Sequence, residues 1–388
     1  MRISGLRATP INIPLEAPMW WSGGLYPGTS KLIIEVETDA GVVGLGEAPS
    51  TELYAAVAAM GERLIGQDPI DIAACEERCV PPWQIVQNTD DSTALKAFGS
   101  IELALWDIRG KAWNAPLHQL LGGAVRRDIE FTEYFGFRLD REMTPEAIVD
   151  YCLRMRAEHG STYFEGKLCV GDPALEVETV RQMRAALGPG AMIRLDANMR
   201  YSLATARRVL AQLEPFDVRN YEDPVATFEE LRALRQHCTI PFSTHVPDLR
   251  RAVSYGVPDF IVVNFAVLGG IARTVRFIGA CEAMGVGFWC YSGDAGIATA
   301  AYLHVSAAMP WIVEPSQSLL RWQIADVIEN GPFRPVDNRV AVPGGAGLGV
   351  ALDRRALERL HRDFQDRGPL DHFHDPLRPG RYRRLPLA

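Results

Sequence analysis

The stretch that decides the fold runs from Tyr163 to Pro224 and reads YFEGKLCVGDPALEVETVRQMRAALGPGAMIRLDANMRYSLATARRVLAQLEPFDVRNYEDP. Within it, short runs of β-branched and aromatic residues alternate with longer segments whose apolar residues recur at helical spacing. This alternation predicts parallel strands joined by helices, because a parallel pair needs a long crossover connection. We therefore expect a parallel sheet covered by helices.

The same alternation continues on both sides of this stretch. It gives eight expected strands and seven helices, which fit a nearly complete (β/α)7β barrel of the TIM type. The expected strands are 129–136, 163–169, 192–198, 218–224, 240–245, 260–265, 287–292 and 311–315. The expected helices are 145–159, 173–187, 203–214, 228–237, 249–255, 270–284 and 296–309. An open doubly wound sheet is the alternative, but the glycine pairs lack the spacing of a phosphate-binding loop.

The segments outside the barrel have a different pattern. Residues 31–37 (KLIIEVE) and 41–47 (GVVGLGE) flank a turn and predict a hairpin, and helical spacing follows over 52–66 and 93–113. The first part of the chain is therefore expected to be a small α+β domain. After the barrel, 354–364 predicts a helix. The last twenty residues form a basic tail, which either wraps a neighbouring surface or frays.

Composition and charge exclude several classes of protein. Hydrophobic residues make up 47% and charged residues 23% of the chain, as in globular proteins and unlike disordered ones. With 40 Lys and Arg against 48 Asp and Glu, the chain has no basic excess, so nucleic-acid and membrane partners are not expected. The seven cysteines form no CxxC pair, and neither a membrane span nor a signal peptide is visible. We expect a cytoplasmic protein.

Polar residues stand at the expected carboxyl ends of the strands, where barrel enzymes carry their catalytic groups. Asp196 and Glu222 end two adjacent strands, and Lys167 ends the strand before them. Neighbouring carboxylates repel each other unless a cation lies between them, and Mg²⁺ prefers such oxygen ligands. A lysine beside a bound cation can act as a general base. These residues predict a metal-assisted acid–base site.

Five motifs carry a resemblance to a known family. They are TSKLIIEVETDAGVVGLGEAP (29–49), SIELALWDIRGKAWNAPLHQLLGG (100–123), RLDANMRYS (194–202), YEDP (221–224) and GGAGLGVALD (344–353). Together they resemble the enolase superfamily, in its mandelate racemase and glucarate dehydratase branch. The resemblance implies a barrel over 126–350, and a capping domain formed from 1–125 and the C-terminal return over 351–388. It also implies Mg²⁺, a small carboxylate substrate whose α-proton is removed, and a homo-oligomer.

The resemblance makes Asp196 and Glu222 the first two metal ligands, and it aligns the third ligand position with His245. An imidazole ligand suits Mn²⁺ or another transition metal better than it suits Mg²⁺. Two alternatives stay open: Asp248 reaches into the site, or His245 is a base and no third side chain binds.

The residues at the base positions differ from the family pattern. Relatives carry Lys-x-Lys on the second strand, whereas this chain has Lys167 and Cys169, so either Lys167 acts directly or the Cys169 thiol replaces the second lysine. Relatives also carry a His–Asp dyad, whose approximate positions hold Tyr291 and Asn264. Because asparagine cannot support an imidazolium, a two-base racemase is disfavoured. Tyr291 is the expected acid for a departing hydroxyl.

Substrate contacts are expected from three further groups of residues. Asn198 and Asn264 stand at expected strand ends, and Glu314 resembles a family acid that hydrogen-bonds the substrate carboxylate. Residues 17–26 resemble a mobile specificity loop, in which Trp20, Trp21 and Tyr26 lie beside two glycines and suit a lid that excludes water.

The sequence thus predicts a metal-dependent lyase that dehydrates a hydroxy- or sugar-derived acid. An epimerase, racemase or cycloisomerase of a less polar acid is the first alternative, favoured by the aromatic lid. A catalytically lapsed barrel that binds a small acid is the second, because the second lysine and the dyad are missing.

Overall fold

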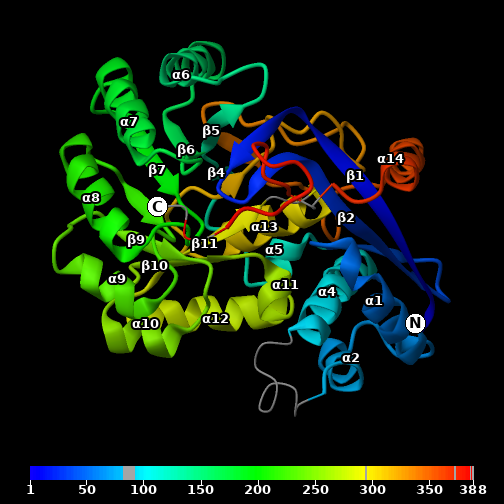
Figure 1. Ribbon diagram of the computed structural model, residues 1–388. Coiled ribbons are helices and arrows are strands. Elements are labelled where there is room, and N and C mark those ends of the chain that lie inside the picture. Colours follow the sequence, from blue (N-terminus) through cyan, green and yellow to red (C-terminus); the bar gives the residue numbers. More distant parts are fainter. Residues whose placement is uncertain (82–91, 293–294, 371–372, 385, 387–388) are drawn as a thin grey trace.

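The computed structural model describes residues 1–81, 92–292, 295–370, 373–384 and 386 (Figure 1). Eight parallel strands pair in chain order within this part of the chain. They are β5 (Glu133–Arg138), β6 (Tyr163–Lys167), β7 (Met192–Asp196), β8 (Asn220–Glu222), β9 (Phe242–Thr244), β10 (Phe260–Val263), β11 (Gly287–Ser292) and β12 (Gln317–Ser318). A parallel bridge between Phe131 and Ser316 joins the last strand to the first. The predicted barrel is therefore confirmed.

Helices cover the outside of this barrel (Figure 1). They are α6 (Pro145–His159), α7 (Pro173–Leu187), α8 (Leu203–Leu213), α9 (Phe228–Arg235), α10 (Leu249–Tyr255), α11 (Phe265–Leu268), α12 (Ile271–Met284) and α13 (Gly296–Ala308), with a 3-10 turn η2 (Glu214–Phe216). The side chains of Thr144, Asp172, Ser202 and Thr227 each accept a hydrogen bond from a first-turn amide. These caps satisfy amides that have no partner within the helix, and they explain why the helices begin there.

The cap is built on three antiparallel strands, β1 (Ile3–Trp21), β2 (Gly24–Thr38) and β3 (Val43–Ala48). Its remaining elements are η1 (Thr51–Leu53), α1 (Tyr54–Leu64), α2 (Ile72–Cys79), α4 (Thr93–Ala112) and α5 (Leu117–Leu120). Helix α14 (Arg354–Arg367) returns to this sheet, where His361 Nδ1 lies 2.7 Å from the Pro10 carbonyl oxygen of β1 (Figure 1). The end of β1 also pairs with β5, so the cap sheet continues into the barrel.

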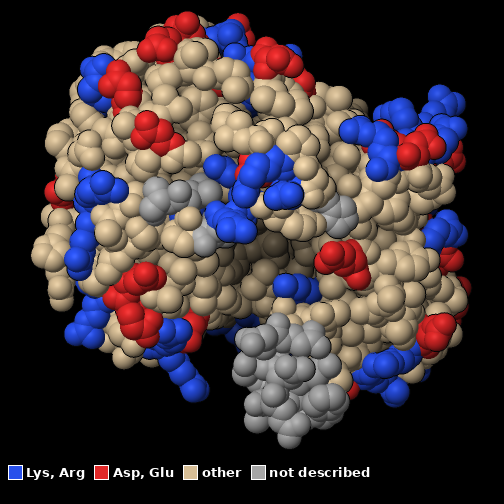
Figure 2. Space-filling view, viewed as in Figure 1, with Lys and Arg blue, Asp and Glu red and all other residues tan. Residues whose placement is uncertain are grey.

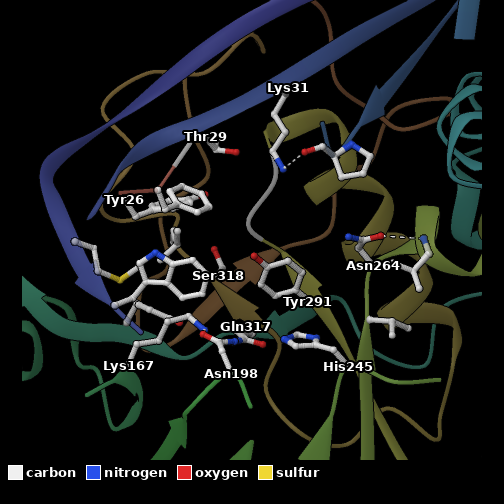
Figure 3. Close-up of a pocket in the computed structure, with 18 residues that line it drawn as sticks. Tyr26, Thr29, Lys31, Lys167, Asn198, His245, Asn264, Tyr291, Gln317 and Ser318 are labelled. Atoms are coloured by element: carbon white, nitrogen blue, oxygen red, sulfur yellow. Dashed lines mark hydrogen bonds between the residues drawn. The ribbon is translucent and has the colours of Figure 1, made fainter. Parts of the chain in front are cut away.

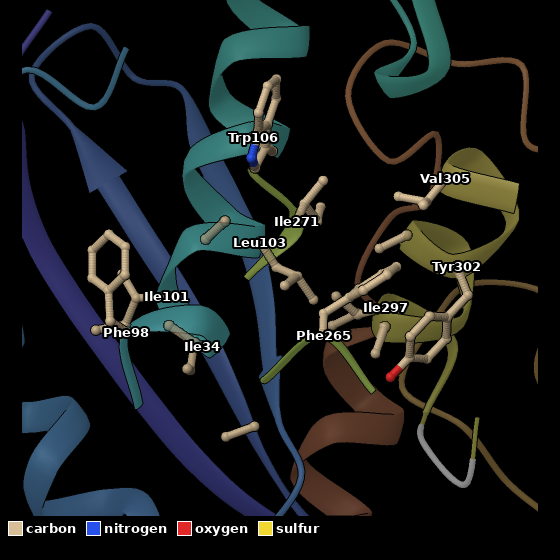
Figure 4. Packing of buried hydrophobic residues seen from close by; sticks show 14 of the residues in the cluster. Ile34, Phe98, Ile101, Leu103, Trp106, Phe265, Ile271, Ile297, Tyr302 and Val305 are labelled. Carbon is tan, nitrogen blue, oxygen red and sulfur yellow. The ribbon is translucent and has the colours of Figure 1, made fainter. Parts of the chain in front are cut away.

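The long helix α4 joins the cap to the barrel through one apolar core (Figure 4). Its buried residues face α12, α13 and Phe265, and Gly99 approaches the barrel so closely that a Cβ there would lie 2.6 Å from the Gly270 nitrogen. Glu102 accepts hydrogen bonds from the Ile271 and Ala272 amides, at 2.6 and 2.9 Å, and so caps α12. These contacts fix the cap against the barrel.

Two expected strands differ from the structure. The first divides into β4 (Asp128–Glu130), which pairs with β13 (Arg339–Ala341), and β5. The eighth was expected at 311–315, but these residues form a turn after α13, and β12 begins at Gln317. The apolar run Trp311–Ile312–Val313 has the pattern of a strand but is apolar for another reason. The Trp311 indole donates to the Val286 carbonyl, and Ile312 packs into the core.

A buried histidine pair predicts acid sensitivity. His304 on α13 donates from Nε2 to the Leu348 carbonyl, and its Nδ1 lies 2.9 Å from Nδ1 of His118 on α5, so one of the two facing nitrogens must accept. Burial, followed by the charge of His118, lowers the pKa of His304 to about 4 from its ordinary 6.5. Between pH 6.5 and pH 4 the imidazole of His304 is therefore protonated in the unfolded chain and neutral in the folded chain. The free energy of unfolding consequently decreases as the pH falls through this range.

We expect acidification from pH 7.5 to pH 4 to cost about 3 kcal/mol of the free energy of unfolding at this pair, at roughly 1.4 kcal/mol per tenfold difference in proton affinity. Urea unfolding of the unmodified protein and of His304→Asn checks this at several pH values. The substitution should flatten the acid limb of the curve, and parallel curves for the two proteins would contradict the expectation. Burial raises the pKa values of Glu102 and Glu176, which makes the folded protein more stable as the pH falls. These contributions are the same in both proteins, so they cancel when the two curves are compared.

Helices long and apolar enough to cross a membrane were not found among the described residues.

Candidate active site

Three of the predicted site residues meet at the carboxyl ends of adjacent strands. Asp196 ends β7, Glu222 ends β8, and His245 follows β9 directly. Asp196 lies opposite Glu222, and Glu222 lies opposite Ser243, in the ladders that join these strands. One ligand atom from each of the three side chains lies within 4.8 Å of the others. The structure thus brings together the three residues expected to bind a metal.

The cluster concentrates acidic groups in a buried place. Burial, with the Asp196 carboxylate as the next cause, raises the pKa of Glu222 to about 8, and burial raises the pKa of Asp223 to about 6. His245 Nε2 lies 2.7 Å from Glu222 Oε1. Burial opposes a charge on this imidazole, but the carboxylates of Glu222, Asp223 and Asp196 outweigh it and raise the pKa of His245 to about 10. The cluster therefore attracts positive charge.

The donor atoms fit a divalent cation. Apart from the imidazole contact, neither oxygen of Glu222 has a hydrogen-bond partner among the described residues. His245 Nδ1 lies 2.9 Å from the Val262 carbonyl oxygen, which can only accept, so Nδ1 carries the hydrogen and the other nitrogen faces the carboxylates. Metal-ligating histidines are oriented in this way. Two carboxylates and an imidazole suit Mn²⁺ at least as well as Mg²⁺.

Lys167 ends β6 and points toward the same cluster. Its ammonium contacts Asp196 Oδ2, donates to Asn198 Oδ1 at 2.6 Å, and lies 5.5 Å from the centre of the Trp21 ring. Asn198 is fixed in turn, because its backbone amide donates to Asp196 Oδ1 at 2.7 Å and its side-chain amide donates to Oδ2 at 2.9 Å. One buried carboxylate therefore positions both side chains.

Lys167, Asn198 and His245 line one side of a cavity of about 410 Å³ (Figure 3). Lys167, Asn198 and His245 rise from the barrel, Tyr291, Gln317 and Ser318 come from β11 and β12, and Tyr26, Thr29 and Lys31 reach in from β2. The cavity is also lined by Met19, Trp21, Pro49, Tyr134, Val263, Asn264, Val267, Leu319 and Phe373. It lies between the barrel and the cap, with its more polar groups on the barrel and on β2.

Tyr291 and Asn264 both line this cavity, as expected. The Tyr291 ring packs edge-on against the His245 ring, with centroids 5.4 Å apart. Asn264 begins α11, and its side-chain oxygen accepts from the Val267 amide at 3.1 Å. Neither is a second strong base opposite Lys167.

Cys169 does not line the cavity, which corrects one expectation. Period-two alternation would give it the same face as Lys167, but β6 ends at Lys167, so the alternation does not extend to Cys169. The thiol is buried, and burial raises its pKa. It is therefore a packed side chain rather than a base.

We expect Cys169→Ser to change kcat/KM by less than about fivefold, because the thiol is buried away from the cavity. Steady-state kinetics of the two proteins check this, with circular dichroism confirming that the variant is folded. A much larger fall of kcat/KM in a folded variant would show that the Cys169 thiol takes part in the reaction.

The segment 17–26, which resembles the family's specificity loop, forms the end of a hairpin. β1 continues to Trp21 and β2 begins at Gly24, so side chains alternate between two faces. Trp21 and Tyr26 face the cavity, but Trp20 points away from it and packs with the barrel core, opposite Phe137 of β5. Trp20 is therefore removed from the expected substrate contacts.

Glu314 also lies away from the cavity. Its carboxylate pairs with Arg219, which precedes β8 and so stands at the opposite end of the barrel from the metal cluster. The expectation failed because it placed Glu314 at the end of a strand, whereas β12 begins three residues later. The residues that take this place in the cavity are Gln317 and Ser318.

Sequence analysis missed several residues that line the cavity, among them Thr29, Lys31, Tyr134 and Phe373. Thr29, Ser30 and Lys31 are buried polar residues on one strand, and such a run is a signal for a binding wall rather than a core. Lys31 Nζ lies 3.3 Å from the Pro49 carbonyl oxygen. No comparable signal marked Phe373.

Comparisons with known proteins agree with this architecture. Residues 6–122 match the mandelate racemase / muconate lactonizing enzyme N-terminal domain, and residues 147–356 match the enolase C-terminal domain-like family. The chain is 29% identical to a probable glucarate dehydratase of Streptomyces coelicolor, over 94% of this chain and 92% of the relative. It is 28% identical to a chloromuconate cycloisomerase of Cupriavidus necator, over 93% and 100% of the two chains.

Solved structures give the same result. An enolase from Thermobispora bispora, complexed with magnesium and formate, is 28% identical with a TM-score of 0.87, over 95% of this chain and 94% of that chain. An enolase from Pseudomonas fluorescens with bound magnesium, potassium and tartrate is 26% identical with a TM-score of 0.88, over 95% and 93%. The two family models match the cap and the barrel of one chain. The chain therefore belongs to the mandelate racemase / muconate lactonizing enzyme family of the enolase superfamily.

Proposed function

We propose that the protein is a metal-dependent lyase that removes water from a polyhydroxylated carboxylic acid. The observation that carries this proposal is the contact of Lys167 with the cluster of Asp196, Glu222 and His245, beside a cavity that Lys167 and His245 line. A divalent cation, Mg²⁺ or Mn²⁺, held by these three side chains would neutralise the substrate carboxylate and the charge that develops beside it. The similarity to structures complexed with magnesium supports such a cation.

Lys167 is the proposed base. Its Nζ stands beside the cluster, and its side chain lines the cavity. Lys167 would remove the proton α to the carboxylate, and the electron pair left behind would expel the hydroxyl from the next carbon. Tyr291 would donate a proton to this leaving hydroxyl, which departs as water. The resulting enol takes up a proton at C3 and releases the proton of its C2 hydroxyl, and so becomes a 3-deoxy-2-keto acid.

The polar lining favours dehydration of a polyol acid over the alternatives. Thr29, Asn198, Asn264, Gln317 and Ser318 all line the cavity and offer hydroxyl or amide groups to substrate hydroxyls. A racemase needs a second base on the far side of the α-carbon, and the residues at the positions of the family's His–Asp dyad, Tyr291 and Asn264, do not supply a strong one. The similarity to a probable glucarate dehydratase supports the same reaction class.

A cycloisomerase of a less polar acid is the second candidate. Trp21, Tyr26 and Phe373 give the cap side of the cavity an aromatic character. The similarity to chloromuconate cycloisomerase supports this candidate.

A substrate panel in deuterated water separates the candidates. The purified protein with Mg²⁺, and separately with Mn²⁺, is incubated with aldonic acids, aldaric acids and muconates, and products are followed by NMR. We expect a 3-deoxy-2-keto acid from at least one polyol acid. Conversion of muconates alone would replace the lyase with a cycloisomerase. Neither turnover nor exchange of an α-proton would favour a barrel that only binds acids.

A further inference from the structure

The C-terminal segment 373–383 lies against the active-site hairpin formed by β1 and β2 (Figure 1). The chain reaches it from α14 through two anchors, a hydrogen bond from Asn12 Nδ2 to the Gly368 carbonyl at 3.0 Å and one from the Leu370 amide to Ser30 Oγ at 2.7 Å. The Leu25 amide then donates to the His374 carbonyl at 3.1 Å. Gly368, Leu370 and segment 373–383 therefore pack on the cap strands.

The fit between this segment and the hairpin is close. A Cβ at Gly24 would lie 2.4 Å from the His374 carbonyl oxygen, and Gly24 has a φ of +137°, which side chains rarely permit. The segment also holds its own shape, because the Asp375 amide donates to the Arg381 carbonyl at 2.8 Å and the Asp375 carboxylate accepts from Arg378 Nε at 2.8 Å. Such a preformed turn loses little entropy when a ligand binds beside it.

Phe373 brings the segment into the cavity. Its ring lies edge-on to Trp21, with centroids 5.3 Å apart, and 4.9 Å from the centroid of Tyr26. All three rings line the cavity. They form an aromatic wall to which the hairpin and the C-terminal segment both contribute; the centre of its Trp21 ring lies 5.5 Å from Lys167 Nζ, and Phe373 packs on Trp21 and Tyr26. An aromatic face of this kind packs against C–H groups of a substrate chain.

Arg383 ties this wall to the barrel. Its guanidinium donates to the carbonyls of Trp21 and Ser22, at 3.2 and 3.4 Å, and to the Val170 carbonyl at 2.6 Å. Val170 lies three residues after Lys167, in the connection that follows β6. One side chain thus links the hairpin end to the barrel segment beyond the proposed base. Figure 2 shows Lys and Arg side chains gathered beside the hollow of this face.

We propose that Phe373 is a specificity-determining residue, which packs on the part of the substrate chain distant from its reacting carboxylate, and that Arg383 is the positioning residue that holds the aromatic wall. This inference rests on the proposed function only in taking this cavity as the acid-binding site. It implies that the protein selects acids long enough to reach the wall, and that four-carbon acids gain nothing from Phe373.

Equilibrium binding tests the selection without turnover. Titration calorimetry with Mg²⁺ present compares tartrate with galactarate, a six-carbon acid of the same chemistry. The unmodified protein should bind galactarate more tightly, and Phe373→Ala should weaken galactarate about 10-fold while leaving tartrate unchanged. Two results would overturn the inference: the unmodified protein binds galactarate no more tightly than tartrate, or Phe373→Ala prefers galactarate as strongly as the unmodified protein does. Selective binding of galactarate, with no dehydration of any acid in the substrate panel, would overturn the proposed function alone.

Arg383 is tested against a neighbour of the same type. Arg383→Ala should raise the rate of amide hydrogen exchange at Leu25 about 10-fold and should raise the galactarate dissociation constant. The increase in thermal stability that a bound divalent cation gives the protein, here called metal-linked thermal stabilisation, should be unchanged. Arg383→Lys should restore part of both effects. Arg381→Ala is the control, because the Arg381 guanidinium has no hydrogen bond or ion pair within the described part of the chain. Equal effects of Arg381→Ala and Arg383→Ala would refute the positioning role.

Discussion

Lys167→Met is expected to lower kcat/KM for the substrate found by the panel by about 100-fold at least, and by as much as about 10⁴-fold, which is the range that a general base contributes. Methionine is an unbranched side chain that reaches as far as the lysine Cε and lacks the amine, so the variant loses the contact of Nζ with the Trp21 ring but keeps an apolar stem. Asn198 can still hold Asp196, because its own hydrogen bonds to that carboxylate do not involve Lys167. The loss should therefore be one of chemistry and not of folding.

Exchange of the substrate α-proton with deuterated water, measured by NMR, isolates the step assigned to Lys167. The variant should lose this exchange together with turnover. Metal-linked thermal stabilisation should persist, because the ammonium that now contacts Asp196 Oδ2 no longer competes with a cation. Cys169→Ser serves as the control on the same segment. A Lys167→Met protein that still exchanges the α-proton would transfer the role of base to another residue.

Much of the barrel could be predicted because local signals and tertiary packing agree there. Helices α6 and α7 begin where Thr144 and Asp172 precede a proline, and α6 ends at Gly160, which has the left-handed conformation that glycine favours. β12 could not be predicted, because its two residues, Gln317 and Ser318, are buried and polar. Their place in the sheet depends on pairing with β11 and not on their own apolar pattern.

The residues of the candidate site also divide into those that the sequence could predict and those that it could not. Asp196, Glu222 and Lys167 were identified because each ends a strand, and strand ends of a parallel barrel converge. Cys169 and Glu314 were misplaced by errors of two or three residues in strand boundaries, which local patterns determine least well. Phe373 meets Trp21 across more than 350 residues of chain, and no local pattern predicts such a contact.

Glu222→Gln is expected to abolish metal binding and to lower kcat/KM by more than about 100-fold, since even the partners that orient metal ligands contribute about 10–100-fold. The amide keeps the shape of the side chain but removes the negative charge that joins Asp196 and His245 in the cluster. Thermal unfolding measured with and without Mn²⁺ gives a readout that needs no substrate. At a cation concentration 100 times the dissociation constant, the unmodified protein should gain about 2.7 kcal/mol of stability.

The Glu222→Gln protein should gain no stability from Mn²⁺, whereas Glu314→Gln, which changes an acid paired with Arg219 at the other end of the barrel, should gain as much as the unmodified protein. The gain should also shrink as the pH falls, because protonated His245 has no lone pair to offer and must release its proton when a cation binds. A stabilisation by Mn²⁺ that survives Glu222→Gln would place the cation elsewhere and would leave these buried carboxylates without the role assigned to them.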